Sequence, residues 1–142
     1  MNEVATTVES CDGGLIGRTV CVDYAGCEAV DVLRDQSLLR SFMDEFCAEV
    51  GIRVISNASK SFGPGAGVTS VNVLATSSLT VHTWPEVGAA CIDLFSCKIN
   101  LDDEFVERFF AGVFRAATST RTSFDRVAPD RVPAHASAAL QG

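Results

Sequence analysis

Three strand-like segments follow one another between residues 68 and 96 with very short connections. Residues 68–75, 78–83 and 89–96 are rich in β-branched and apolar side chains, as strands require. The connections between them are too short for the crossover that a parallel pair needs, so successive strands must run antiparallel. A Gly- and Pro-rich loop at residues 62–67 precedes them and cannot continue a strand. This pattern restricts the chain to folds built on an antiparallel sheet.

The remaining segments supply two helices and three further strands. Residues 36–50 carry apolar side chains at helical spacing, and residues 102–117 do so with acids in the first turn. Residues 18–24, 52–56 and 118–127 are strand-like. The order β-α-β-β-β-β-α-β predicts an α+β fold, a two-layer sandwich with both helices on one face of a mainly antiparallel sheet. The other sheet face needs cover, which favours a homodimer.

We expect one folded unit with loose ends. Residues 1–14 are interpreted as a flexible leader, residues 15–128 as a single α+β domain, and residues 129–142 as a disordered tail. The N-terminus lacks the basic and apolar regions of a secretory signal, and no apolar run reaches the roughly 18–20 residues of a membrane span. A cytoplasmic protein with no membrane partner is expected, with its cysteines reduced.

The charge of the chain restricts its partners. A formal net charge of −7 argues against nucleic acid as a partner and suits a cationic small molecule. The six cysteines form no C-x-x-C pair and the chain has two histidines, so no metal site is expected.

Residues 76–86 read T-S-S-L-T-V-H-T-W-P-E and hold the side chains with the most chemical potential. They include the hydroxyl of Ser77 and the imidazole of His82, and the thiol of Cys97 follows fifteen residues after the histidine. Taken singly, a turn serine, a half-buried strand histidine and a buried thiol are consistent with a purely structural role. A hydrolase triad is weakly supported, because no acid that could orient the histidine is evident. Their combination favours a catalytic site.

The combination resembles the prokaryotic pyruvoyl-dependent S-adenosylmethionine decarboxylases, whose precursors cleave themselves at a serine in a segment like E-S-H-L-T-I-H-T-W-P-E. Residues 82–86 match H-T-W-P-E, and residues 93–97 are similar to the family's D-x-F-T-C segment. Residues 62–69 resemble its F-x-P-x-G-x-S loop, with one extra residue. The similarity covers roughly residues 17–114.

The resemblance implies a pyruvoyl cofactor derived from the chain itself. The Ser77 hydroxyl would attack the Thr76 carbonyl, the chain would break between residues 76 and 77, and residue 77 would become the pyruvoyl group that forms a Schiff base with substrate. His82 would accept the proton during processing. Thr69, where the family has serine, would assist through its hydroxyl. Cys97 would donate a proton to the product in turnover.

The implied substrate is S-adenosylmethionine, an amino-acid-type small molecule whose decarboxylation yields the aminopropyl donor of polyamine and spermidine synthesis. Phe62, Trp84 and Glu86 are the substrate-binding candidates, with Phe62 placed to stack on adenine beside the sulfonium. The resemblance also implies a homodimer of cleaved protomers with its sites near the interface.

Three departures from the family pattern leave alternatives open. Thr76 and Ser78 stand where the family usually has glutamate and histidine, and Val87 replaces an aromatic residue. Because a lost polar contact can change specificity by orders of magnitude, the substrate could instead be a basic amino acid such as arginine or ornithine, or a related amine precursor. A third hypothesis is an unprocessed homologue that acts as a non-catalytic partner subunit.

Overall fold

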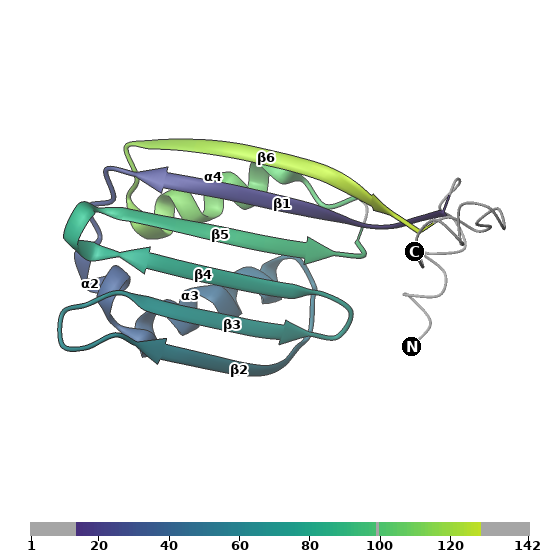
Figure 1. Cartoon of the computed structure of the whole chain (residues 1–142). Coiled ribbons are helices and arrows are strands. Elements are labelled where there is room, and N and C mark those ends of the chain that lie inside the picture. The colour runs from purple at the N-terminus through teal and green to yellow at the C-terminus, as the bar shows by residue number, and fades with distance from the viewer. Residues whose placement is uncertain (1–13, 99, 129–142) are drawn as a thin grey trace, which may run out of the picture.

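Six antiparallel strands form one sheet, and helices cover one of its faces in the computed structural model of the chain (Figure 1). The structure describes residues 14–98 and 100–128, so the expected tail and all but the last residue of the expected leader lie outside the described residues. The elements in chain order are β1 (Leu15–Ala25), α2 (Val30–Arg34), α3 (Gln36–Glu49), β2 (Val54–Ser61), β3 (Val68–Leu74), β4 (Ser78–Trp84), the short 3₁₀ helix η2 (Pro85–Val87), β5 (Ala89–Ser96), α4 (Asp103–Phe114) and β6 (Thr118–Val127).

The strand order β2-β3-β4-β5-β1-β6 confirms the predicted antiparallel α+β sandwich. Strands β2 to β5 form a continuous meander, and β1 pairs with both β5 and β6. None of the helices in residues 14–98 and 100–128 is long and apolar enough to cross a membrane.

The structure adds one helix to the sequence-based expectation and moves the ends of several elements, most of all those of β2 and α4. The five-residue helix α2 was not expected, because it is too short to show a helical period. Strand β2 was expected at 52–56 but begins at Val54 and runs to Ser61, since its polar residues pair with β3 as far as Val68. Helix α4 was expected to reach residue 117 but ends at Phe114, where Arg115 adopts the left-handed conformation (φ 47°) that caps helices.

The core lies between the sheet and the two long helices. Phe46 of α3 and Phe110 of α4 are fully buried and their ring centroids are 5.1 Å apart. The sheet contributes fully buried aliphatic side chains: Val22, Leu79, Val81, Ile92 and Leu94. Each such side chain contributes about 1.5–3 kcal/mol through its burial, so the helices are held mainly by apolar contact.

An ion pair fixes α4 to the sheet. The guanidinium of Arg18 on β1 donates to both carboxylate oxygens of Asp103 at the start of α4, at 3.1 and 2.8 Å, and to Asp125 on β6 at 2.6 Å. This arrangement lowers the pKa of Asp103 and raises that of Arg18, because each charge is stabilised by hydrogen bonds to its partner.

The sheet face opposite the helices, here called the open face, carries the candidate site residues. Side chains alternate along β4, so Leu79, Val81 and Thr83 are buried under the helices while Ser78, Thr80, His82 and Trp84 lie on the open face. Cross-strand pairing continues a row from His82 to Thr69 on β3 in one direction. In the other it runs to Cys91 on β5 and Asp23 on β1.

Thr83 connects the H-T-W-P-E segment to its neighbours from the buried face. Its hydroxyl accepts a hydrogen bond from the Val68 N–H at 2.9 Å and donates to the Leu33 carbonyl of α2. A side chain at Gly67 would place its Cβ 2.1 Å from the Thr83 carbonyl oxygen, so only glycine permits this approach. These contacts determine where β3 begins beside β4.

We expect Thr83→Val to lower the free energy of unfolding by about 1–3 kcal/mol, because the Val68 N–H and the Leu33 carbonyl would remain buried without their partner. Thr80→Val is the matched control, since it makes the same change on the same strand but on the open face. Urea denaturation of both variants measures the difference. Equal losses for the two variants would contradict this role for Thr83.

Candidate functional site

The turn between β3 and β4 holds Ser77. The Leu74 N–H donates to the Ser77 carbonyl at 3.0 Å and closes the turn, and the Ala75 N–H donates to the Arg53 carbonyl at 3.1 Å. Ser77 is half-buried and immediately precedes β4. The expected cleavage bond, between Thr76 and Ser77, therefore lies in a tight turn at one end of the sheet.

Cys97 lies beside this turn. Register pairs Ser78 with Phe95, so the residue after the end of β5 reaches the level of the turn. The Thr76 Oγ1 and Cys97 Sγ atoms are 2.7 Å apart, within hydrogen-bonding distance. Thr76, Ser77 and Cys97 are called the cleavage cluster below.

His82 and Thr69 form a second group on the open face. The Thr69 Oγ1 atom lies 3.0 Å from His82 Nδ1, across the register pair that joins β3 and β4. The Trp84 ring is 6.2 Å from the imidazole, centroid to centroid. Because one ring nitrogen is engaged by the hydroxyl, the other can accept or donate a proton. Thr69, His82 and Trp84 are called the histidine cluster.

Within one chain the two clusters lie toward opposite ends of β4. Ser77 precedes the strand and His82 is five residues further along, which corresponds to about 16 Å of extended backbone. Figure 1 shows the β3–β4 turn and the C-terminal end of β4 at opposite ends of the strands. A proton transfer between His82 and Ser77 of the same chain is therefore out of reach in this conformation.

The three substrate-binding candidates lie toward the histidine cluster. Phe62 follows β2 and is 62% exposed, Trp84 ends β4 and is 43% exposed, and Glu86 lies in η2 and is exposed. They share the end of the sheet at which β2 and β4 finish (Figure 1). The structure brings them near His82 and not near the Ser77 of their own chain.

Four open-face residues were missed by the sequence reasoning. Cys21 pairs with Asp93, and Asp23 pairs with Cys91, the register partner of His82, so thiols and carboxylates alternate on β1 and β5 of this face. Burial, together with the nearby carboxylates, raises the pKa of Cys91 to about 11, and burial and Asp93 raise that of Cys21. Both thiols are thus protonated at neutral pH. The available signal was the Cys-x-Asp spacing in each strand, which places both side chains on one face.

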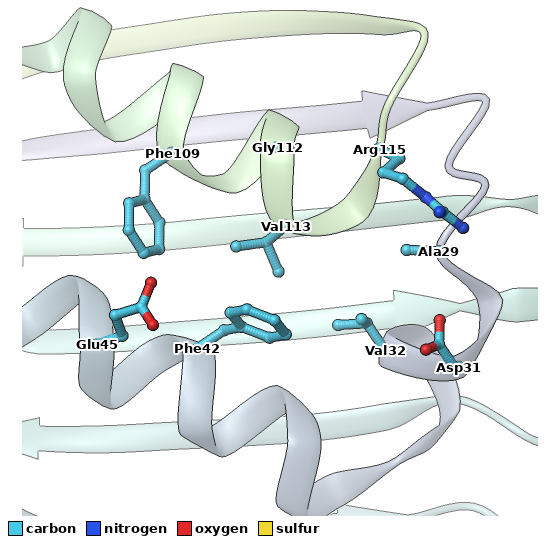
Figure 2. A pocket seen from close by; sticks show the side chains of 9 residues that line it. All are labelled: Ala29, Asp31, Val32, Phe42, Glu45, Phe109, Gly112, Val113 and Arg115. Atoms are coloured by element: carbon cyan, nitrogen blue, oxygen red, sulfur yellow. The ribbon is translucent and has the colours of Figure 1, made fainter.

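A cavity of about 380 Å³ lies elsewhere, between the helices (Figure 2). Its walls include Phe42 of α3 with Phe109 and Val113 of α4, and none of the predicted site residues lines it. Within residues 14–98 and 100–128, no group of three His, Cys, Asp or Glu side chains is placed to hold a metal ion.

The geometry defines a small α+β domain with a serine turn beside a thiol and an imidazole further along the same strand. The profile of the S-adenosylmethionine decarboxylase family matches residues 18–127. The chain belongs to this family.

Individual relatives agree with that assignment. The S-adenosylmethionine decarboxylase proenzyme of Caldicellulosiruptor saccharolyticus is 32% identical over 111 residues, covering 78% of this chain and 88% of the relative. The proenzyme of the same name from Acetivibrio thermocellus is 36% identical over 115 residues, covering 78% and 91%. The crystal structure of the adenosylmethionine decarboxylase from Aquifex aeolicus has the same fold, with a TM-score of 0.73 at 20% identity over 84% of this chain and 98% of the other.

We expect the Thr69 hydroxyl to determine the hydrogen bonding of the His82 ring. Thr69→Val should change the ring ¹⁵N resonances of His82, and Thr69→Ser should restore them, because serine keeps the hydroxyl. The chain has two histidines, so His135 serves as an internal reference in the same spectrum. Unchanged His82 resonances in Thr69→Val would contradict the contact.

Proposed function

We propose that this chain is a proenzyme that cleaves itself at Ser77 and then decarboxylates S-adenosylmethionine. The observation that carries the proposal is the cleavage cluster: a half-buried serine in a tight turn, with the preceding residue hydrogen-bonded to a thiol. The relatives from Caldicellulosiruptor and Acetivibrio are named proenzymes, which supports self-processing.

The cleavage chemistry follows from the residues of the turn. The Ser77 Oγ attacks the Thr76 carbonyl carbon, the C–N bond breaks, and an ester replaces the peptide bond. A base removes the Cα proton of residue 77, and the Cβ–Oγ bond breaks with release of the Thr76 carboxylate. Water then displaces ammonia from the remaining unsaturated residue and leaves the pyruvoyl group.

The pyruvoyl group would supply the electron sink that decarboxylation requires. Cys97, next to the turn, would donate the proton that replaces the lost carboxyl group. Ser77 fits the role of precursor of the pyruvoyl group, since its turn lies at the end of the sheet where the Cys97 thiol contacts Thr76, the residue before Ser77.

The open face suits a cationic substrate. Asp93 on β5 and Asp23 on β1 contribute negative charge to the face that carries His82, and Trp84 offers an aromatic surface that favours a sulfonium. The net charge of −7 acts in the same direction. We infer a cytoplasmic enzyme that supplies the aminopropyl donor of polyamine synthesis.

We further propose a homodimer in which two open faces pack together. Trp84 on β4, Val73 on β3 and Phe124 on β6 are large apolar side chains that remain exposed on this face of the single chain. A two-fold axis near the middle of β4 would bring the histidine cluster of one protomer to the cleavage cluster of its partner. Such a dimer would give Ser77 the base and the aromatic side chains that its own chain holds at a distance.

The intact mass of the purified protein tests self-cleavage. We expect two pieces, residues 1–76 and 77–142, in place of one 15.0 kDa chain, and the second piece should gain mass with a carbonyl reagent. Ser77→Ala should stay uncleaved because it lacks the attacking hydroxyl. Ser78→Ala is the matched control and should still cleave between residues 76 and 77.

Release of labelled CO₂ from carboxyl-labelled S-adenosylmethionine by the cleaved protein completes this test. Release of CO₂ from arginine or ornithine instead would contradict the proposed substrate, while the proposed pyruvoyl cofactor would stand. A wild-type chain that stays uncleaved after long incubation would contradict the proposal and favour a non-catalytic partner subunit.

Mixed dimers test the shared site. Alone, the His82→Ala chain should cleave at least about 100-fold more slowly than the wild type, since loss of a general base commonly costs this much. Co-expression with Ser77→Ala, which retains His82, should restore cleavage of the His82→Ala chain. If purified mixed dimers leave that chain uncleaved, the sites are not shared between protomers.

A further inference from the structure

We propose that Cys97 acts a first time before turnover, by positioning Thr76 for the self-cleavage reaction. This inference rests on the proposed function and extends it. It assigns to Thr76 and Cys97 the role of positioning residues in processing, in addition to the proton donation expected of Cys97 later.

The first observation that supports the inference is the contact between the Thr76 side chain and Cys97. The neighbours of Thr76 are held by backbone hydrogen bonds, from Leu74 to Ser77 and from Ala75 to Arg53. In the described part of the chain, the hydrogen bond that Thr76 makes joins its Oγ1 to Cys97 Sγ at 2.7 Å. The backbone hydrogen bond from Leu74 to Ser77 closes the turn, and the contact with Cys97 adds a side-chain restraint on the residue whose carbonyl must be attacked.

The second support is that the anchor itself is firmly held. Cys97 follows Ser96, which is 1% exposed at the end of β5, in the interior of the sheet. The Lys98 N–H donates to the Ser96 hydroxyl at 2.9 Å, and the Lys98 ammonium donates to the Val50 carbonyl at 2.8 Å. The chain is thus held on both sides of Cys97, so the thiol that contacts Thr76 has a fixed position.

Cleavage depends on this kind of orientation. Attack requires the Ser77 Oγ and the Thr76 carbonyl carbon to approach to about 3–3.5 Å along the correct direction. Holding the Thr76 side chain fixes the direction of its Cα–Cβ bond, which restricts rotation of the adjoining peptide plane. Without the contact, the turn would sample more orientations and fewer of them would react.

Cleavage rates of freshly translated precursor test the inference. Thr76→Val, which keeps the shape and removes the hydroxyl, and Cys97→Ala should each slow cleavage about tenfold, the effect of one hydrogen bond. The double variant should be no slower than either single one, since both remove the same contact. Thr76→Ser should cleave at close to the wild-type rate. Cys27→Ala is the control for loss of a thiol elsewhere, and thermal melts verify that each variant is folded.

Two results would overturn the inference while the proposed function stands. One is wild-type cleavage rates in Thr76→Val and Cys97→Ala. The other is a double variant whose slowing is the product of the single effects, because independent effects do not require a shared contact. Failure of the wild-type chain to cleave would instead contradict the proposed function.

A second measurement applies even to chains that do not cleave. In a Ser77→Ala background, the S–H stretching band of Cys97 is assigned in the infrared spectrum by its loss in Cys97→Ala. Adding Thr76→Val should shift this band, and adding Thr76→Ser should leave it in place. A band that Thr76→Val does not move would show that the hydroxyl and thiol do not interact.

Discussion

Strand β4 carries the central constraint of this molecule, because its pairing with β3 and β5 decides which side chains meet on each face. Leu79 and Val81 are buried under the helices, and His82 lies on the opposite face. A slip of one residue would reverse every side chain of the strand, moving the imidazole into the core and these apolar groups out of it. The buried face thus determines the position of the reactive one.

The same register accounts for both clusters. It brings Thr69 next to His82 in the interior of the sheet and places the β3–β4 turn beside the end of β5, where Thr76 meets Cys97. An extended strand also keeps its two ends apart, so the serine turn and the histidine cannot meet within one chain. The proposed site shared between two protomers would reconcile this separation with the proposed self-cleavage at Ser77.

Much of the fold could be predicted from the chain, because alternating and helical patterns report directly which face of an element is buried. The meander and the two long helices follow from such patterns. Helix α2 could not be predicted, since five residues show no period, and the length of β2 depends on its pairing with β3 rather than on its own polar side chains. The end of α4 could not be predicted either, because the residue in the left-handed conformation that caps this helix is Arg115 and not the usual glycine.

For the site, the sequence by itself determined which groups are available: a serine beside a threonine, a histidine five residues on, and a thiol after the next strand. Their types and spacing are local properties that any reader of the chain can recover. Only the tertiary structure decided their partners: Thr69 for His82, Cys97 for Thr76, and the carboxylates of Asp23 and Asp93 on the same face as His82. The physical reason is that cross-strand neighbours are set by register, which depends on burial and turn geometry summed over the whole sheet.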